Sequence, residues 1–355
     1  MTRELYRVNG LPVLQNRTFA SADQARGCGQ ADIVLVQDER SGLIFNQAFD
    51  SSKLVYDADY QNEQAHSAQF QKHLEDVESI LSRHFAGQQL IEVGCGKGYF
   101  LEKLRGLGYA ITGIDPSYEG DNPDVIKAPF TRDLGLSADG IVLRHVLEHM
   151  ADPRLFLREI AAANQGGTIY IEVPCFEWII EHRAWFDVFY EHVNYFRLDD
   201  LRRLFATVHE AGHLFGGQYL YIVADLASLR EPPAAPALVQ LPSDFTASLE
   251  RAVHIIQAAP DQGVAIWGAS SKGVIFSLFL QRAGVALDHI VDINPAKQGR
   301  YLPLSGLRVS SPQEALDTLP EGAHLLVMNS NYLKEIKRMT NERFVYHAVD
   351  STSFQ

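Results

Sequence analysis

The sequence predicts an α/β protein: a mostly parallel sheet covered by helices, a small β-rich region before it, and a second α/β unit after it. Between Leu90 and Val173, short apolar runs alternate with helical patterns, as is typical of parallel sheets. The first 65 residues instead carry short β-type runs separated by turn signals. A strand, a glycine turn and a helical pattern then recur from Gly263 onward.

The central region supplies the clearest element predictions. A helix is expected where five apolar side chains fall on one face: Phe70, Leu74, Val77, Leu81 and Phe85. The strands that follow are expected at Leu90–Val93, Ala110–Ile114, Val125–Ala128, Gly140–Leu143 and Thr168–Val173. Further helices are expected after Gly98 and over Leu155–Ala163. Residues 218–224 read as one more strand.

Composition shifts divide the chain into three predicted domains. The β-rich part covers residues 1–65, the central α/β domain 66–230, and the C-terminal α/β domain 243–355. Between the last two, Glu231–Pro242 contains four prolines in twelve residues. Such a segment predicts a semi-rigid linker.

Bulk composition argues against several classes of function. The net charge is −13, from 31 basic and 44 acidic residues, whereas nucleic-acid binders normally present a basic surface. The first ten residues lack an apolar signal region, and the run Val274–Leu280 is too short to span a membrane. Three scattered cysteines indicate reduced thiols, not a zinc site. We therefore expect a cytoplasmic protein with no nucleic-acid or membrane partner.

The most informative motif is the glycine-rich turn within Leu90–Phe100. Glycines there remove the Cβ atoms that would block a ligand from approaching the backbone. An acid stands two residues before the first glycine, and the next strand ends on another acid, where a ribose diol would bind at a parallel sheet. The predicted cofactor residues of this motif are Glu92, Gly94, Cys95, Gly96, Gly98, Asp115 and Pro116.

The glycine spacing distinguishes between two kinds of cofactor. It reads Gly-x-Gly-x-Gly, whereas dinucleotide enzymes carry Gly-x-Gly-x-x-Gly. Together with the preceding acid, it resembles the S-adenosyl-L-methionine (SAM) loop of class I methyltransferases, which have a Rossmann-like sheet. An ordinary glycine-rich strand-to-helix turn is the alternative. The resemblance implies SAM as cofactor.

Residues at the ends of neighbouring strands extend this site. Arg144 and His145 follow the strand 140–143, at the sheet edge where cofactor and substrate would meet. Pro129 and Phe130 follow the preceding strand, where an adenine ring is commonly covered, with core packing as the alternative. The nearby acid and histidine at 148 and 149 lack a third ligand, so no metal is predicted.

A second informative segment is Trp185–Phe196, which mixes aromatic side chains with acids, a histidine and an amide. Buried polar groups each need a partner, and a substrate pocket is one place that supplies them. His192 titrates near neutrality and can accept a proton, although a satisfied core or surface histidine is the alternative.

The turn Gly268–Gly273 leaves a strand and enters a helix in the C-terminal domain. Backbone N–H groups at a helix start, with Ser271 and Lys272, would suit a phosphate. The spacing is not that of a Walker motif, and a tight strand–helix connection is the alternative.

These segments together resemble the SAM-dependent deoxysugar C-methyltransferases of antibiotic biosynthesis. The similarity covers most of the chain: Glu92–Gly98, Arg144–Pro153, Tyr190–Phe196, Gly268–Gly273 and Val291–Pro303. It implies three parts, namely an N-terminal zinc-bearing domain, a central SAM domain and a C-terminal Rossmann-like domain without SAM. It also implies a nucleotide-linked keto-sugar substrate lying between them.

The resemblance implies residue roles and also shows two departures. His192 matches the histidine that removes the proton next to the ketone, and Tyr56 and Tyr60 match assisting tyrosines. The zinc cysteines are absent, with only Cys28 in the first 90 residues, so the first domain is expected to keep its fold without metal. Tyr190 stands where the family usually has a further histidine.

The sequence therefore predicts a SAM-dependent methyltransferase that acts on a small-molecule metabolite in biosynthesis. The expected catalytic residues are His192, Glu191, Tyr190 and His145. The expected substrate-binding residues are Tyr56, Tyr60, Asn194, Ser271 and Lys272. The leading hypothesis is C-methylation of a keto-sugar nucleotide with His192 as the base. A phosphorylated or nucleotide-linked acceptor is compatible with this hypothesis. The alternatives are O- or N-methylation of a non-sugar natural-product intermediate, an NAD-type oxidoreductase, and a non-catalytic nucleotide-binding protein.

Overall fold

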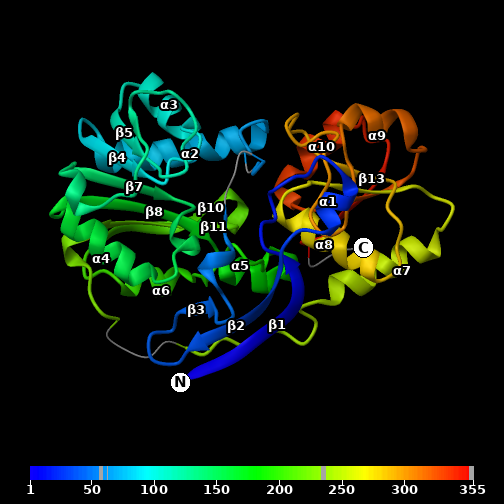
Figure 1. Cartoon of the computed structure of the whole chain (residues 1–355), viewed down its shortest axis with the longest axis horizontal. Helices are drawn as coiled ribbons and strands as arrows, with labels where there is room; N and C mark the ends of the chain where they lie inside the picture. The colour runs from blue at the N-terminus through cyan, green and yellow to red at the C-terminus, as the bar shows by residue number, and fades with distance from the viewer. Residues whose placement is uncertain (56–58, 62, 233–236, 352–355) are drawn as a thin grey trace.

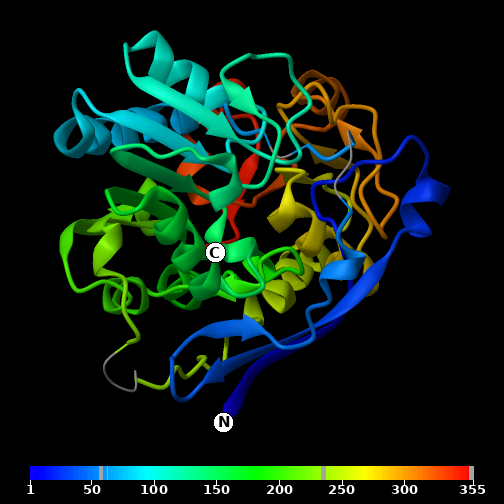
Figure 2. The ribbon, with the colours of Figure 1, turned by 60° about the vertical axis from the view of Figure 1, so that its left-hand side comes forward.

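The computed structural model describes residues 1–55, 59–61, 63–232 and 237–351. Figure 1 shows two α/β lobes side by side, the central part of the chain in one and the C-terminal part in the other. The N-terminal strands run along one side of both lobes, and Figure 2 shows the same arrangement from another direction. Among the described residues, no helix has the length and apolar character that crossing a membrane requires.

The N-terminal sheet has four antiparallel strands in the order β1-β2-β3-β9. Their bounds are β1 (Thr2–Pro12), β2 (Gln30–Asp38), β3 (Ile44–Asn46) and β9 (Asn194–Tyr195). The short helices α1 (Ala22–Arg26) and η1 (Ser51–Lys53) complete this part. The fourth strand comes from far along the chain, because β9 pairs with β3 through the pair Ile44 and Tyr195.

The central sheet has seven strands in the order β10-β11-β8-β7-β4-β5-β6. The parallel strands are β4 (Gln89–Val93), β5 (Ala110–Ile114), β6 (Val125–Ile126), β7 (Gly140–Arg144) and β8 (Thr168–Pro174). Strand β11 (Tyr219–Asp225) runs antiparallel between β8 and β10 (Val208–Leu214). The predicted α/β class with a Rossmann-like sheet is confirmed.

Helices cover both faces of this sheet because its strands are apolar on both sides. On one face Leu90 and Val142 pack in a core with α2 and α3, and on the other Ile91 and Ile141 pack with α4. Figure 1 shows these helices on opposite sides of the strands. The bounds are α2 (Ala68–Phe85), α3 (Tyr99–Gly106), α4 (Pro153–Asn164), α5 (Phe176–Glu181) and α6 (Leu198–Arg203).

Helix α2 shows how local sequence starts a helix and orients it. The Ser67 side chain accepts the backbone N–H of Phe70 and so caps the first turn. The predicted apolar stripe is buried along its whole length: Phe70, Leu74, Val77, Leu81 and Phe85. The stripe therefore fixes which face of α2 covers the sheet.

The C-terminal sheet has five parallel strands in the order β14-β13-β12-β15-β16. They are β12 (Val264–Trp267), β13 (His289–Val291), β14 (Val309–Ser310), β15 (His324–Val327) and β16 (Val345–Ala348). The helices are α7 (Ala247–Ala258), α8 (Ser271–Arg282), α9 (Pro312–Thr318) and α10 (Leu333–Met339). This unit is a second parallel α/β fold.

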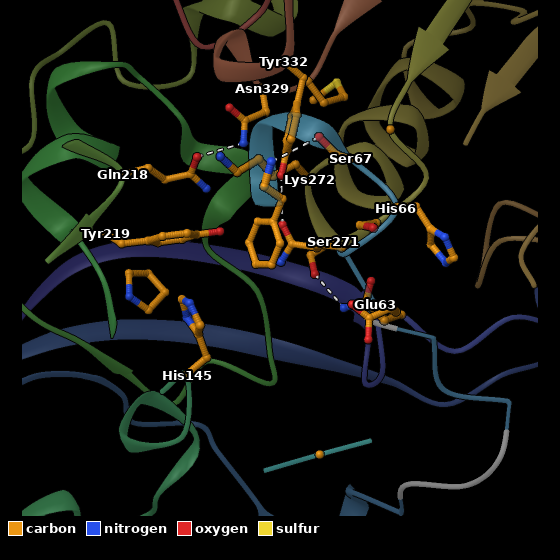
Figure 3. Close-up of a pocket in the computed structure, with 18 of the residues that line it drawn as sticks. Glu63, His66, Ser67, His145, Gln218, Tyr219, Ser271, Lys272, Asn329 and Tyr332 are labelled. Carbon is orange, nitrogen blue, oxygen red and sulfur yellow. Dashed lines mark hydrogen bonds between the residues drawn. The ribbon is translucent and has the colours of Figure 1, made fainter. Parts of the chain in front are cut away.

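Side-chain contacts join the three parts of the fold. Glu335 of α10 accepts the Ser67 hydroxyl at 2.6 Å, at the start of α2. Asn329 donates to Gln218 at 2.8 Å, a contact visible in Figure 3. The described end of the proline-rich segment packs on β2, because Val239 N–H donates to Gln37 at 2.8 Å. The first two of these contacts lie in the wall of the site described next.

Candidate active site

A cavity of about 390 Å³ lies where the central and C-terminal units meet. Its walls come from the loop after β4, the end of β7, the start of β11 and the loops after β12, β13 and β15. Figure 3 shows His145 and Tyr219 of the central unit in this cavity with Ser271, Lys272 and Tyr332 of the C-terminal unit. The carboxyl ends of parallel strands from both sheets thus face one space, the usual place for ligands in such folds.

The loop after β4 requires glycine at its first position. Gly94 has φ +75°, and a Cβ there would lie 2.3 Å from Val146 Cγ2, so no larger side chain fits. Gly96 N–H donates to Asp115 Oδ2 at 2.8 Å, while the Ser117 hydroxyl donates to Oδ1 at 2.6 Å. Asp115 therefore shapes the loop through bonds to its neighbours and is not among the described residues that line the cavity.

Glu92 presents the clearest sign of a ligand at this loop. Its side chain is 3% exposed and lines the cavity, yet Oε2 has no hydrogen-bond partner among the described residues. Burial raises the pKa of Glu92 to about 7, with Asp115 adding to the rise and Arg144 opposing it. A buried carboxylate without a partner is costly unless a ligand pairs with it. The residues present therefore fit a positively charged donor such as SAM.

Three residues expected to contact the cofactor lie elsewhere in the structure. Phe130 is buried in the core between the sheet and its helices, because its ring packs among apolar side chains. Pro116 and Pro129 are exposed at the surface. None of the three is among the described residues that line the cavity. Cys95 does line it, whereas Gly98 instead begins α3 as its left-handed cap.

Arg144 ends β7, His145 follows it, and both line the cavity. His145 has φ +53°, a left-handed conformation that few residues other than glycine adopt, and such strain clusters at functional sites. Its Nε2 lies 2.9 Å from Glu172 Oε1, and its Nδ1 lies 3.4 Å from Glu148 Oε1. Burial alone would lower the pKa of His145, but these two carboxylates raise it to about 9. The imidazole is therefore cationic at neutral pH.

His192 also lines the cavity, but its surroundings shift its pKa in the opposite direction to that of His145. Its ring lies 3.9 Å from the Phe189 ring and 5.0 Å from the His149 ring. Burial holds the pKa of His192 well below its usual range, and the nearby charges of His149, His145 and Lys272 lower it further. His192 is therefore neutral near pH 7 and has a lone pair that can accept a proton.

The neighbours of His192 have structural contacts instead of cavity contacts. Glu191 Oε2 accepts the backbone N–H of Gln15 at 2.7 Å, and the Tyr190 hydroxyl accepts the backbone N–H of Asp50 at 2.7 Å. Asn194 donates to the Met150 carbonyl at 2.5 Å. Tyr190, Glu191 and Asn194 are buried, and none is among the described residues that line the cavity.

The two substrate residues expected from the C-terminal loop line the cavity but are already engaged. Lys272 Nζ lies 3.2 Å from Asp187 Oδ2 and 4.4 Å from the centre of the Trp178 ring. Asn16 donates to the Ser271 hydroxyl at 3.1 Å. Lys272 is thus ion-paired with a carboxylate, while its Nζ has no hydrogen-bond partner among the described residues, so a phosphate contact at this lysine stays a prediction.

Of the two tyrosines expected to bind substrate, only Tyr60 lies within the described residues. Tyr60 lines the cavity and hydrogen-bonds with Glu191, which lowers the pKa of that carboxyl against the larger rise caused by burial. Tyr56 lies outside the described residues. The N-terminal part thus reaches the cavity through Tyr60 and through Asn16.

One group of cavity side chains has the composition of a metal site. Glu148, His149 and His192 offer ligand atoms that all lie within 4.8 Å of one another. The sequence alone lacked this third ligand, because His192 comes from a distant segment. His149 Nδ1 donates to the Glu191 carbonyl at 2.8 Å, so Nε2 is the ring nitrogen left for the group. The geometry can therefore serve either a cation or acid–base chemistry.

Sequence reasoning missed several residues of the site. Tyr219 and Gln218 were read only as part of a strand, and Tyr332 and Asn329 fall after β15 without any motif. Glu172, which holds His145, did carry a signal, because it is an acid inside the apolar run 168–173. An ionisable side chain in a buried strand needs charged partners, so it marks a polar site.

Comparisons with known proteins agree with this architecture. A family model described as a methyltransferase domain matches residues 63–209. A second one, described as a C-methyltransferase C-terminal domain, matches residues 243–346. The C-methyltransferase NovU of Streptomyces niveus is 27% identical, over 70% of this chain and 68% of that protein.

Two further comparisons cover a smaller share of the chain. A ubiquinone biosynthesis O-methyltransferase of Caulobacter vibrioides is 31% identical over 24% of this chain and 41% of its own length. The solved structure of a Burkholderia thailandensis 1,6-didemethyltoxoflavin-N1-methyltransferase, with S-adenosylhomocysteine bound, is 16% identical. It covers 44% of this chain and 78% of that one, with a TM-score of 0.32.

The sheet order, the glycine loop with its buried acid and the matched methyltransferase domain define a SAM-dependent methyltransferase. The chain is an enzyme of this class, and SAM is its cofactor. Its C-terminal unit matches the family model described as a C-methyltransferase C-terminal domain, and its sequence is similar to that of the C-methyltransferase NovU. A small-molecule acceptor is consistent with the size of the cavity.

Proposed function

We propose that the enzyme transfers a methyl group to a carbon next to a carbonyl group of a small molecule. The observation that carries this proposal is the pair of cavity histidines with opposite charge states, His145 cationic and His192 neutral. Two titratable groups whose environments push their pKa values apart are a mark of acid–base chemistry. Methylation at carbon needs such a pair, because the C–H bond must lose its proton first.

In the proposed mechanism each side chain has one task. When bound, SAM supplies a methyl group with the electrophilic character needed for an in-line displacement. His192 accepts the proton of the acceptor carbon, and the electron pair of that bond moves toward the carbonyl oxygen. The Nδ1–H of His145 donates to the oxygen as negative charge develops there. Glu92 and the glycine loop hold the donor in line with the carbon, so alignment supplies part of the acceleration.

A nucleotide-linked keto sugar is the acceptor that we propose to test first. Support comes from the resemblance to deoxysugar C-methyltransferases described above and from the walls that Trp267 and Asn329 of the C-terminal unit add to the cavity. The pairing of Lys272 with Asp187 counts against a phosphate at that lysine. We therefore expect a phosphorylated acceptor to bind through backbone N–H groups at the start of α8 instead.

O-methylation is the second candidate, and the group Glu148, His149 and His192 favours it. A divalent cation held there would lower the pKa of an acceptor hydroxyl and would occupy the lone pair of His192. The two candidates differ in one measurable respect. Turnover by the proton-transfer route survives exhaustive chelation, whereas turnover by the cation route is lost and returns with added Mg²⁺ or Zn²⁺.

The proposal is tested by assaying S-adenosylhomocysteine formation with nucleotide-linked 3-keto sugars and, separately, with catechols. His192→Ala should lower turnover of the keto sugar by about 10²–10⁴-fold and leave SAM affinity unchanged. His254→Ala, an exposed histidine on α7, is the matched control and should turn over normally. Unchanged turnover of His192→Ala, or methylation of catechols alone, would contradict the carbon-acid proposal.

A further inference from the structure

A group of side chains with metal-binding atoms lies outside the cavity, at the start of α5. Cys175, Glu177 and His213 offer a sulfur, a carboxylate oxygen and a ring nitrogen, and these atoms all lie within 4.8 Å of one another. None of the three is among the described residues that line the cavity. Cysteine spacing in the sequence gave no sign of this group, because only one of its members is a cysteine.

The central sheet brings the histidine of this group to the cysteine from a distant segment. Cys175 follows β8, and its backbone N–H donates to the Gln218 carbonyl, just before β11, at 2.9 Å. In the edge strand β10, His213 lies opposite Leu220 of β11, which lies opposite Val173 of β8. Residues directly opposite one another share a face of the sheet. Leu220 and Val173 belong to the core in which α5 also packs, so His213 is on the α5 side.

The distance between the sulfur and the carboxylate suits a zinc ion. Cys175 Sγ lies 3.8 Å from Glu177 Oε2. Tetrahedral zinc binds sulfur at about 2.3 Å and oxygen at about 2.0–2.2 Å, which places two such ligand atoms about 3.6 Å apart. The exposed ring of His213 makes no hydrogen bond to another described residue, so its nitrogen is available as a third ligand. Water can take the fourth position.

Backbone groups hold both of the anionic ligands in place. The Trp178 N–H donates to Cys175 Sγ at 3.4 Å, and the Leu198 N–H donates to Glu177 Oε2 at 3.0 Å. Outer contacts of this kind orient metal ligands. Burial raises the pKa of Cys175 to about 12, so the side chain is a thiol without metal, and a bound metal displaces its proton to solvent. The thiolate and the carboxylate then carry two negative charges, which match a divalent cation.

We propose that Cys175, Glu177 and His213 form a Zn²⁺ site that connects the edge strand β10 to α5. The mixed sulfur, nitrogen and oxygen ligands favour zinc over Mg²⁺ and Ca²⁺, which take oxygen ligands. Glu177 and His213 are exposed, so the metal can enter from solvent. Because the three ligands meet only in the folded chain, binding stabilises that state. The site is independent of the acceptor proposed above, since it lies outside the cavity.

The test uses Co²⁺ as a spectroscopic probe for zinc, because a cobalt–thiolate bond gives a charge-transfer absorption in the near ultraviolet. Metal-free, full-length enzyme is titrated with Co²⁺ at pH 8 under reducing conditions. We expect this band to saturate at one cobalt per chain and to disappear when Zn²⁺ is added. Cobalt bound by Glu148, His149 and His192 in the cavity gives no such band, because that group contains no cysteine. A titration without the band, or a band that Zn²⁺ does not remove, overturns the inference.

Two pairs of variants assign the band to this site. Cys175→Ser should abolish it, and serine can still accept the Trp178 N–H, so α5 keeps its cap. His213→Ala should weaken cobalt binding by more than about 100-fold, because losing a ligand costs more than losing an outer contact. The matched controls are Cys28→Ser, at a half-buried cysteine in the N-terminal part, and His209→Ala, at another exposed histidine of β10. Both controls should keep the band and its affinity.

A band that persists in Cys175→Ser, or one that is lost in Cys28→Ser, places the cobalt on another thiol and rejects the site. Unchanged affinity in His213→Ala rejects the connection to β10. Urea unfolding gives a readout that needs no cobalt. Zn²⁺ should raise the unfolding midpoint of the wild type and of His209→Ala equally, and that of His213→Ala by less. Equal shifts in all three proteins would mean that zinc acts elsewhere, which also rejects the site.

Discussion

The central and C-terminal units contain the same hydrogen-bonded turn, but different side chains lie in it. In each, the first strand of the α/β pattern enters a turn whose backbone N–H is held by the acid that follows the next strand. Gly96 N–H donates to Asp115 at 2.8 Å, and Ala269 N–H donates to Asp292 at 2.9 Å. The other oxygen of each acid accepts a backbone N–H two residues on, each at 2.8 Å. The two turns therefore make equivalent hydrogen bonds to their acids.

The two turns differ in the side chains that lie in and next to them. Two residues before its first glycine, the central unit has Glu92, whereas the C-terminal unit has Ile266 before Gly268. The C-terminal turn is also filled from within, because the buried Lys297 donates to the Ala269 carbonyl at 3.2 Å and to Ser270 at 2.7 Å. The same backbone geometry therefore leaves an unpartnered carboxylate for the proposed donor in one unit and holds a lysine of the chain itself in the other.

The sharpest way to break this comparison is to add one methyl group to each turn. Gly94→Ala places a Cβ 2.3 Å from Val146 in a backbone with φ +75°, so the loop must move. We expect S-adenosylhomocysteine affinity to fall at least 1000-fold, or about 4 kcal/mol. Gly268→Ala meets Met328 at an ordinary 3.5 Å, so it should lower stability and leave affinity within 3-fold. Calorimetry decides, and equal losses in the two variants would refute the comparison.

Replacing the acid that distinguishes the central unit should have a smaller effect. Glu92→Gln removes a charged partner of the donor, and we expect affinity to fall about 10- to 100-fold, matching roughly 1.5–3 kcal/mol for a charged hydrogen bond. An affinity equal to that of the wild type at pH 8 would remove Glu92 from the donor site. Calorimetry at that pH makes the measurement.

The same variant has a distinct pH signature in the enzyme without donor. Because burial raises the pKa of Glu92 to about 7, the folded state holds its proton more tightly than the unfolded chain does. The free energy of unfolding therefore falls as pH rises from about 4.5 to about 7, by up to roughly 3 kcal/mol. Glu92→Gln should abolish this fall, so urea unfolding at pH 8 should show a stabilised variant. A variant no more stable than wild type would contradict the assignment.

Removing the hydrogen bonds of Lys297 in the C-terminal turn should lower the stability of the protein without changing its affinity for the donor. Lys297→Met keeps the length of the side chain but removes its two hydrogen bonds and its charge near Asp292. We expect a loss of about 1–2 kcal/mol in the free energy of unfolding, because relief of lysine burial offsets part of the lost bonds. Donor affinity should not change, and a tenfold change would mean that the two turns are coupled.

The contact between the units should give the smallest effect. Glu335 of α10 adds a carboxylate to the start of α2, where the Ser67 hydroxyl donates to it at 2.6 Å. Glu335→Gln keeps an acceptor but removes the charge that favours a helix N-terminus, so about 0.3–1 kcal/mol should be lost. Chemical unfolding measures it, and Glu342→Gln, an exposed acid just beyond α10, is the control. No difference between the two would assign no role to the charge.

Local patterns predicted much of the fold. Strands β5 and β8 lie within a residue of their expected bounds, because apolar runs between glycine breaks are determined by neighbouring residues. Strand β6 is shorter than expected and ends at Ile126, two residues before Ala128. The pairing of β9 with β3 could not be predicted, because it joins segments about 150 residues apart and both are too short to carry a pattern.

Some features of the candidate site could be predicted from local sequence, whereas others depend on contacts between distant segments. The glycine loop and its acid were predictable, since the constraint lies within consecutive residues. His145 was predictable from its place after a strand, and His192 from its place among aromatic residues. Their opposite charge states depend on carboxylates and cations brought close by folding. The engagement of Lys272 by Asp187 was not predictable, because its partner comes from another unit of the structure.

The short pairing of Ile44 with Tyr195 has a consequence for how the enzyme can vary. The outer strand of the N-terminal sheet comes from the segment that carries His192, the proposed proton acceptor, which lies three residues before Tyr195. Drift in the packing of that sheet would therefore be transmitted directly to reaction rate, while recognition of the methyl donor stayed intact. Variants that slow the enzyme could thus arise well away from the chemistry, in a part of the molecule that looks like mere scaffolding.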